Sequence, residues 1–212
     1  MKKLLFIVAA MFAAVSFSSC DKDDDNGGGS DFARPALPDP DDVCSCMDDV
    51  VFMKYCYENF DVNKDGKVSK TEANAVTKID LTGADVKTLT GIGYFPNLEI
   101  IICKNCSRLA TADLSLNLKI TTVVKEAFYE CGNLTSIILP ASLKEIKERA
   151  FDCSQYQPIS IYIKATIPPT LSGVEVFSTS AHILYVPLES VNAYKADEDW
   201  KWFGFEIVGY DF

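Results

Sequence analysis

The stretch from Ala127 to Phe151 reads Ala-Phe-Tyr-Glu-Cys-Gly-Asn-Leu-Thr-Ser-Ile-Ile-Leu-Pro, continues as Ala-Ser-Leu-Lys-Glu-Ile-Lys-Glu-Arg, and then returns to Ala-Phe. Pieces of this pattern recur before and after it in the chain. One such unit cannot bury its own apolar face, so neighbouring units must stack and share a core. The stretch therefore predicts a solenoid, for which the rest of the chain supplies the attachment and the two ends.

The apolar positions repeat at intervals of about 22 residues. Val-x-x-Ile-x-Leu at 76–81 returns as Leu-x-x-Ile-x-Cys at 98–103, and Leu-x-x-Ile-x-Leu at 134–139 returns as Tyr-x-x-Ile-x-Ile at 156–161. The interval lies within the roughly 20–29 residues that are typical of leucine-rich repeats. We assign residues 78–180 to the repeat region.

Four strands are expected within the repeats. Asn-Leu pairs and glycines between the apolar segments have the chemistry of turns. Each strand should add one parallel member to a common sheet. The expected strands lie near residues 79–81, 100–103, 137–139 and 159–163.

One motif in the repeats resembles that of a known family. Ala-Phe-x-x-Cys-x-x-Leu-x-x-Ile-x-Leu-Pro-x-Ser-Leu-x-x-Ile, from Ala127 to Ile146, resembles the BspA-type leucine-rich repeat of bacterial surface proteins. Residues 97–123 resemble a shorter leucine-rich repeat with the core Leu-x-x-Leu-x-Leu-x-x-Asn. The resemblance covers about half of the chain. It implies a solenoid and, for activity, protein or surface binding, because relatives are described as adhesins or remain uncharacterised.

Residues 1–19 have the form of a lipoprotein signal peptide. Lys2 and Lys3 supply the positive region, an apolar run too short to span a membrane follows, and small residues precede Cys20. The segment resembles a bacterial lipoprotein signal, which implies cleavage before Cys20 and lipidation of that cysteine. An ordinary secretory leader with an incidental cysteine is the alternative. Several lipid chains together hold a protein firmly at a membrane.

Residues 20–40 read as a lipidated cysteine followed by a disordered linker. They are rich in Asp, Gly and Pro and poor in large apolar groups. Lys22 and the acidic residues directly after Cys20 resemble a lipoprotein export signal. The resemblance favours an outer-membrane lipoprotein exposed on the cell surface over one that faces the periplasm.

The charge of the chain restricts its partners. The formal net charge is -10 over 212 residues, with 48% hydrophobic residues. Such a chain can build a core but repels nucleic acid and anionic lipid headgroups. We expect no nucleic-acid partner, membrane contact through the lipid anchor only, and a monomer.

The sharpest local motif is Asp61-Val-Asn-Lys-Asp-Gly-Lys-Val-Ser-Lys-Thr-Glu72, which follows an expected helix over residues 41–60. It matches D-x-[DN]-x-[DN]-G-x5-E, the pattern of an EF-hand calcium loop. Ca²⁺ takes about six to eight oxygen ligands, and Gly66 permits the tight turn between them. The candidate calcium ligands are Asp61, Asn63, Asp65, the backbone carbonyl of Lys67, Ser69 and Glu72.

This module resembles a single EF-hand or a dockerin-type loop, with two departures. EF-hands usually pair, yet Val68, at the pairing position, has no second loop to meet. Dockerins usually carry two loops. Because Ser69 and Glu72 also form a capping box for a short helix near 70–77, we interpret residues 41–77 as an N-terminal cap fixed by a structural calcium. An acidic surface turn without metal is the alternative.

The cysteines favour core packing over redox or zinc chemistry. Seven of the eight remain once Cys20 is set aside, so at least one is unpaired. In Cys103-Lys-Asn-Cys106 the repeat register puts the first thiol at a core leucine position and the second at the Asn/Cys position. A zinc site would need two further ligands. Cys131 and Cys153 fall at equivalent core positions, whereas Cys44, Cys46 and Cys56 could include a disulfide with an unnamed partner.

Residues 181–212 are expected to close the solenoid at its C-terminal end. A last strand at Ile183–Pro187 and a short helix at Ser190–Lys195 precede Trp200 and Trp202. Two roles are open for these tryptophans, packing within the end cap or forming an aromatic platform for carbohydrate. His182 has no nucleophile motif beside it and is interpreted as a surface or lining residue.

The expected fold class is α+β, with a short helical calcium-loop cap followed by a leucine-rich-repeat solenoid with a parallel β-sheet. No Gly-x-Ser-x-Gly, His-Glu-x-x-His, phosphate-loop or dinucleotide motif points to an enzyme. We expect a calcium-binding adhesion lipoprotein whose sheet face binds a protein or host ligand. The alternatives are an accessory carbohydrate-binding lipoprotein of a surface glycan-uptake system and a dockerin-like docking module.

Overall fold

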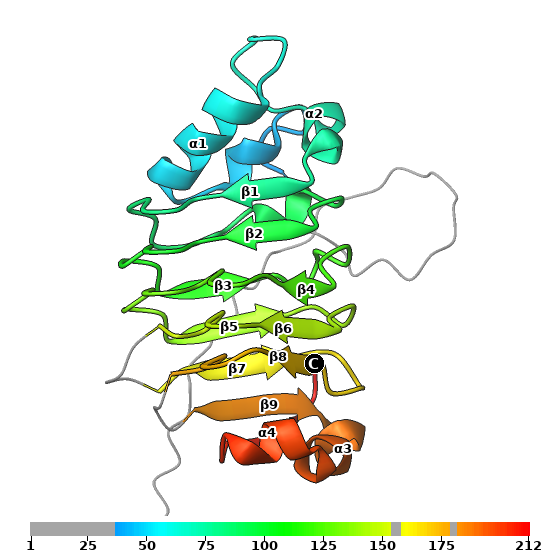
Figure 1. Ribbon diagram of the computed structural model, residues 1–212. Coiled ribbons are helices and arrows are strands. Elements are labelled where there is room, and N and C mark those ends of the chain that lie inside the picture. The colour runs from blue at the N-terminus through cyan, green and yellow to red at the C-terminus, as the bar shows by residue number, and fades with distance from the viewer. Residues whose placement is uncertain (1–36, 154–157, 179–181) are drawn as a thin grey trace, which may run out of the picture. The chain divides into compact units, whose positions relative to one another are not determined.

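The computed structural model describes residues 37–153, 158–178 and 182–212 (Figure 1). Residues 1–36, which hold the predicted lipoprotein signal, Cys20 and most of the predicted linker, lie outside the described part. Within the described part, no helix is both long and apolar enough to cross a membrane.

The repeats wind into a stack of parallel strands with two ladders (Figure 1). From β3 to β9, successive strands belong in turn to a five-stranded and a three-stranded sheet. Every pairing is parallel. The five-stranded sheet contains, in order along the chain, β3 (Thr111–Asp113), β5 (Ser136–Leu139), β7 (Ser160–Ile163), β9 (Ile183–Pro187) and β10 (Glu206–Tyr210). The other strands are β4 (Thr122–Val123), β6 (Glu145–Lys147) and β8 (Thr170–Ser172), together with the separate pair β1 (Lys78–Asp80) and β2 (Ile100–Ile102).

All four predicted strands are present, as β1, β2, β5 and β7, but the prediction of one common sheet is wrong. Ile79 pairs with Ile101, whereas Ile137 pairs with Ile161 in a different sheet. Strands β2 and β5 start about one and a half repeats apart, which carries the chain to the other side of the core. The strand at Ile183–Pro187 is confirmed but is not the last, because β10 adds to its edge.

Aromatic rings and thiols fill the core between the ladders. Phe128, Phe151 and Phe177 form a column with centroids 5.4 and 5.6 Å apart and nearly parallel planes. Cys131 and Cys153 follow Phe128 and Phe151 closely in the chain. Each donates its thiol to a backbone carbonyl at 3.0 Å. Burial raises the pKa of Cys131 to about 12, so this thiol stays protonated as a donor.

The Cys-x-x-Cys motif also lies in the core. Cys103 and Cys106 are fully buried, and the Cys106 thiol donates to the carbonyl of Leu81 at 3.0 Å. The prediction of core packing is therefore confirmed for this pair and for Cys131 and Cys153. All seven cysteines of the described part carry free thiols.

The N-terminal cap contains two short helices where a single helix was predicted over 41–60. η1 (Val43–Cys46) is one 3₁₀ turn, and α1 (Val50–Phe60) begins only after a break. Asp49 causes the break, because its backbone is extended and its carboxylate accepts the first free N–H groups of α1 as an N-cap.

The predicted helices near residues 70–77 and 190–195 are present, together with further short helices that the sequence did not predict. α2 (Lys70–Ala75) begins with the predicted capping box of Ser69 and Glu72. Near the C-terminus, η3 (Leu188–Ser190) runs into α3 (Val191–Ala196), and α4 (Glu198–Trp202) follows. A further 3₁₀ turn, η2 (Ile92–Tyr94), lies in the first repeats.

Candidate functional site

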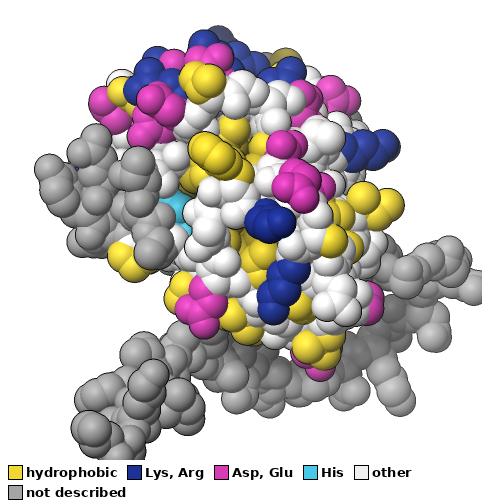
Figure 2. Space-filling view, turned by 60° about the horizontal axis from the view of Figure 1, so that its bottom comes forward, with side chains coloured by type: hydrophobic (Ala, Val, Ile, Leu, Met, Phe, Trp, Pro, Cys, Tyr) yellow, Lys and Arg dark blue, Asp and Glu magenta, His cyan; other side chains and the backbone are white. Residues whose placement is uncertain are grey.

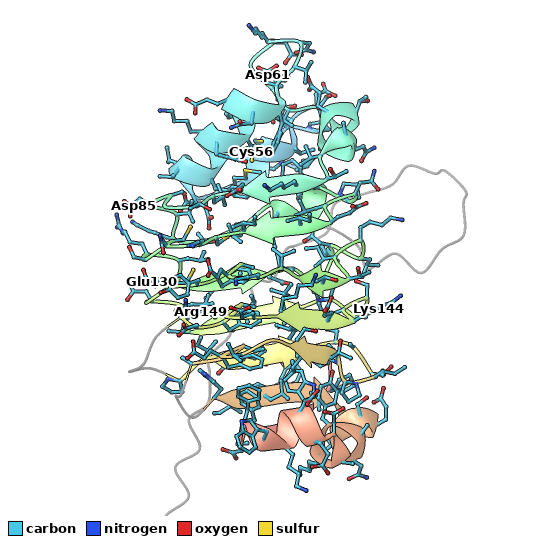
Figure 3. All side chains as sticks on the ribbon, viewed as in Figure 1. Cys56, Asp61, Asp85, Glu130, Lys144 and Arg149 are labelled. Carbon is cyan, nitrogen blue, oxygen red and sulfur yellow. The ribbon has the colours of Figure 1, made fainter. Side chains whose placement is uncertain are left out.

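The predicted calcium loop closes the end of the molecule beyond α1 and α2, where Asp61 is labelled in Figure 3. Asp61 directly follows α1, and its carboxylate turns into the loop to accept the backbone N–H groups of Asp65 at 3.2 Å and Gly66 at 2.9 Å. Gly66 has φ +84°, a left-handed conformation that glycine adopts without strain. The sequence thus folds into the tight turn that the motif predicts.

Glu72 closes the loop from its other side. Its carboxylate accepts the N–H groups of Val62 at 2.8 Å and Asn63 at 3.2 Å, and that of Ser69 at 2.9 Å. The hydrogen bonds from Ser69, followed by those from Asn63 and Val62, lower the pKa of Glu72 to about 2. Glu72 is therefore an ionised carboxylate at neutral pH that reaches across to the start of the loop.

The other candidate ligands lie between these two carboxylates in the chain. Asn63 donates its side-chain amide to Asp65 at 2.9 Å, and the N–H of Asp65 bonds back to the Asn63 oxygen at 3.0 Å. The ammonium group of Lys67 pairs with Asp39 at 3.0 Å, so its backbone carbonyl is the group that it can offer to a cation.

Ca²⁺ is a hard cation that prefers oxygen donors, and this donor set fits it. The loop presents carboxylate, amide, hydroxyl and carbonyl oxygens with no nitrogen or sulfur ligand. In the described part of the chain, no three His, Cys, Asp or Glu side chains gather as a metal cluster, so a complete ligand set here needs the oxygens of Asn63, Ser69 and Lys67.

Val68 is hydrogen-bonded to the start of η1. Its N–H donates to the carboxylate of Asp42 at 3.1 Å, and its carbonyl accepts the N–H of Val43 at 2.9 Å. Sequence reasoning left this pairing position without a partner. The structure fills it with the protein's own N-terminal cap, and buried Asp42 gave no motif by which to find it.

The cap is also bonded to the repeats. Asp49 accepts the N–H of Lys87 at 2.7 Å, and the Tyr55 hydroxyl accepts the N–H of Asp80 at 3.1 Å. Phe60, the last residue of α1, packs against Phe95 with ring centroids 5.5 Å apart. A change in the loop between α1 and α2 therefore has direct contacts through which to reach the first repeats.

A second candidate site is an aromatic surface on the five-stranded sheet, which we call the tyrosine patch (Tyr162, Tyr185, Tyr210 and Phe212). Tyr162 and Tyr185 are paired across β7 and β9, and their rings stack 4.4 Å apart. Tyr210 of β10 packs edge-on against both at 5.2 and 5.8 Å, and Phe212 packs against Tyr210 at 5.0 Å. Tyr162 is buried at 6% exposed, whereas Tyr210 and Phe212 remain 38% and 39% exposed, so these two rings present the patch to solvent.

The two tryptophans have opposite environments. Trp200 is fully buried, and its indole N–H donates to the carbonyl of Pro169 at 2.8 Å, which confirms cap packing for this residue. Trp202 is 85% exposed, so the prediction of cap packing is wrong for it.

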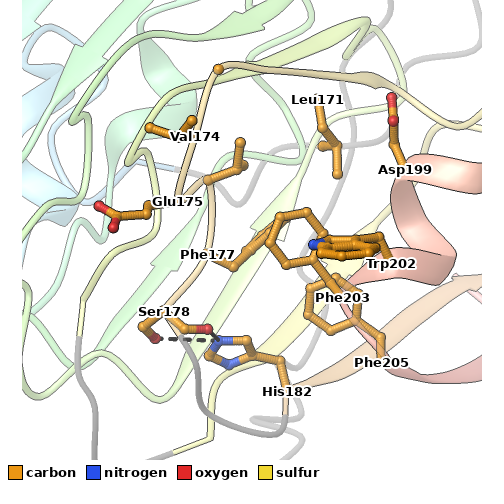
Figure 4. A pocket seen from close by; sticks show the side chains of 12 residues that line it. Leu171, Val174, Glu175, Phe177, Ser178, His182, Asp199, Trp202, Phe203 and Phe205 are labelled. Carbon is orange, nitrogen blue, oxygen red and sulfur yellow. Dashed lines mark hydrogen bonds between the residues drawn. The ribbon is translucent and has the colours of Figure 1, made fainter.

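His182 and Trp202 line the same pocket (Figure 4). His182 is buried, so the prediction of a surface position is wrong and that of a lining position is right.

Comparison with known families covers the centre of the molecule. Residues 97–193 match the family model of the BspA type leucine rich repeat region, in six copies. This segment is a BspA-type leucine-rich repeat region. The family is a non-catalytic repeat domain, and repeats of this kind suggest a protein-interaction module. No curated protein matches the chain.

Proposed function

We propose that this protein is a non-enzymatic, calcium-binding lipoprotein that binds a protein ligand through the solvent face of its five-stranded sheet. The tyrosine patch carries the proposal. Tyrosine is enriched at the energetic centres of protein interfaces, because a rigid ring and a hydroxyl give both contact area and hydrogen bonding. Repeat solenoids use such continuous surfaces for recognition.

The patch is suited to recognition in a further respect. Its rings are already stacked against one another in the free protein, so little side-chain entropy would be lost on binding. Two rings, Tyr210 and Phe212, keep more than a third of their surface in solvent. A host protein or another surface protein is the ligand class that we favour.

Photo-crosslinking tests this proposal. A photo-reactive residue in place of Tyr185 should give crosslinks to a discrete partner on intact cells, whereas the same residue in place of Thr170, on the exposed side of the other ladder, should not. Purified protein should compete for the crosslink, and a Tyr185→Ala/Tyr210→Ala variant should compete at least tenfold less well, by about 1.4 kcal/mol. Equal crosslinking from both positions would contradict the proposal.

The location belongs to the same proposal. Cys20 is the proposed lipidation site, and the chain would be anchored in the outer membrane and exposed on the cell surface. Mass spectrometry of the mature N-terminus should find a lipidated cysteine, and a Cys20→Ala variant should lose membrane attachment. Protease added to intact cells should remove the repeat domain if it faces outward and spare it if it faces the periplasm.

For the calcium loop we propose a structural role, with Asp61, Asn63, Asp65, Glu72, Ser69 and the Lys67 carbonyl holding one ion. The contacts of Val68 with Asp42 and Val43 support a cap that is completed within this chain. A dockerin-like docking role is less favoured, since it would leave a loop free for a partner, whereas this one is already joined to its neighbours. The glycan-binding alternative depends on the opposite end of the molecule.

A further inference from the structure

A pocket of about 580 Å³ opens at the C-terminal end of the solenoid, between the segment that follows β8 and the end of α4 (Figure 4). This volume is within the roughly 300–1,000 Å³ that is usual for small-molecule sites. Figure 2 shows this end of the molecule, where hydrophobic side chains reach the surface between charged ones. The residues that matter most in its lining are Glu175, Phe177, Asp199, Trp202, Phe203 and Phe205.

The pocket has a rigid aromatic floor. Phe177 ends the column of stacked phenylalanines in the core and is only 3% exposed. Phe203 and Phe205 pack edge-on against it with centroids 5.2 and 4.9 Å away. These rings hold one another in place, so the floor is formed before any ligand arrives.

Trp202 differs from the floor residues because its indole is not packed into the core. It is 85% exposed at the end of α4, although Trp200, two residues earlier, is fully buried. A large apolar side chain left in water beside a formed pocket points to a surface that a ligand covers. A flat indole face suits another flat apolar face.

Two carboxylates are the charged groups that line the pocket. Glu175 and Asp199 line it from different elements, and no Lys or Arg is among its lining residues. Arg149 lies 3.6 Å from the Glu175 carboxylate, and Figure 4 shows this side chain pointing away from the aromatic rings, on the other side of the pocket from Asp199. Carboxylates accept hydrogen bonds and repel anions, so the pocket favours a ligand rich in hydroxyl donors and free of phosphate or carboxylate.

His182 does not add a catalytic group to the pocket. Its Nδ1 accepts the N–H of Ile159 at 3.1 Å, and its Nε2 lies 3.2 Å from the carbonyl of Ser178. Burial lowers the pKa of His182, so the ring is neutral and both nitrogens already have partners. His182 is therefore a structural residue of the pocket wall.

We propose that this pocket binds a neutral carbohydrate, with a sugar ring lying on the Trp202 indole and its hydroxyl groups donating to Asp199. Sugars combine apolar ring faces with many hydroxyl donors, which is the combination that the pocket accepts. A lysine-rich peptide would also be attracted by carboxylates. It fits less well, because Arg149 already pairs with the Glu175 carboxylate and so reduces the negative charge of the pocket. The pocket and the tyrosine patch have no residue in common. The carbohydrate proposal can therefore be tested independently of the function proposed above.

Titration of the full chain with short neutral oligosaccharides of glucose, mannose, galactose or xylose tests the proposal by calorimetry and tryptophan fluorescence. At least one sugar should bind at millimolar concentration or below, and Trp202→Ala should weaken it about tenfold or more. Ile167→Ala, which removes a 78% exposed apolar side chain elsewhere, should bind as the wild type does. Both variants should keep the wild-type melting temperature, since neither residue is buried.

A second pair of variants tests the carboxylate. Asp199→Asn should weaken the same sugar severalfold, whereas Glu198→Gln, which changes the neighbouring acidic residue of α4 outside the pocket lining, should not. Three results would overturn the proposal: no binding by any sugar at millimolar concentration, sugar binding that survives Trp202→Ala, or tighter binding of oligolysine that salt abolishes.

Discussion

At the N-terminal end of the repeat stack, carboxylates hold the cap together and join it to the first repeat, whereas at the C-terminal end aromatic rings cover the last strands. Asp42 and Asp49 are buried acids whose oxygens accept backbone N–H groups of the loop, of α1 and of the first repeat. At the other end, Phe177 and Trp200 pack with their centroids 5.7 Å apart beneath Phe203 and Phe205.

The difference follows from what each end must satisfy. A solenoid end exposes both apolar core and unpaired strand edges. Carboxylates supply directional, charge-assisted acceptors and depend on pH and on cations. Aromatic rings supply buried area and depend on size and fit. The two ends should therefore fail under different treatments.

The largest effect is expected at the aromatic end. Trp200→Ala removes a fully buried indole together with its hydrogen bond to Pro169, and should lower the free energy of unfolding by about 3–5 kcal/mol. Urea denaturation of purified protein measures this loss. Trp202→Ala is the matched control and should change stability by less than about 0.5 kcal/mol, because its indole is exposed. Equal losses from both variants would show that the end cap is packed differently.

Calcium should act at the opposite end. A cation present at about 100 times its dissociation constant adds about 2.7 kcal/mol to the stability of the fold that binds it. The melting temperature should therefore rise with calcium and fall with chelator. Asp61→Ala should abolish the rise, while Asp48→Ala, an exposed acid outside the loop, should keep it.

Hydrogen exchange separates a capping ion from a merely bound one. If calcium fixes the cap, the amides of β1 and β2 should exchange more slowly with calcium than without it, since Tyr55 and Asp49 join the cap to this region. Exchange in β9 should not respond. Protection confined to the loop itself would contradict a capping role.

Asp49 gives a smaller effect with a defined pH window. Asp49→Ala removes the N-cap of α1 and the acceptor of the Lys87 N–H, and should cost about 1–2 kcal/mol at neutral pH. Burial raises the pKa of Asp49, but backbone hydrogen bonds from Lys87 and from Phe52 outweigh it and leave the pKa below its usual 3.8. The stability that Asp49 contributes is thus complete above pH 3.8 and is lost as the pH falls through the lower folded pKa.

Denaturation curves of wild type and Asp49→Asn, measured from neutral to acidic pH, test this window. The difference between the two proteins should stay constant above the usual Asp pKa and shrink below it. Exposed Asp48→Asn controls for the loss of one negative charge. A difference that does not depend on pH would mean that the Asp49 charge adds nothing to the hydrogen bonds.

The repeat architecture could be predicted because the apolar residues recur at a regular interval. The second ladder of strands could not be predicted. Strands such as β3, β4 and β6 are two or three residues long and bury one residue each, as Ala112, Val123 and Ile146 do. One buried residue gives no alternation, so periodicity has nothing to detect. The interval between Ile101 and Ile137, which does not fit a whole number of repeats, was the available clue.

The candidate sites divide in the same way. The calcium loop is a contiguous motif and could be read directly, whereas the tyrosine patch joins residues of β7, β9 and β10 and needs the strand register. The different environments of the two tryptophans could have been predicted from the sequence. Residues two apart on a helix point roughly 200° apart, so Trp200 and Trp202 could not both face the core.

His182 offers the finest test of the comparison, because it is the one histidine in the sequence and lies at the aromatic end. Burial lowers its pKa below 6.5, against an opposing hydrogen bond with Ser178. Below pH 6.5 the unfolded chain binds a proton that the folded chain does not, so stability should fall as the pH drops from 6.5 to the folded pKa.

This window lies above that of Asp49, so mild acid should loosen the C-terminal end first. His182→Gln should lower stability at all pH values, because the N–H of Ile159 loses its ring acceptor, but it should remove the extra loss between about pH 7 and pH 5.5. Urea denaturation at those two pH values measures the slope. If the variant and the wild type lose the same stability over this interval, the imidazole is not the group that titrates. The stability of the aromatic end would then not depend on pH in this range.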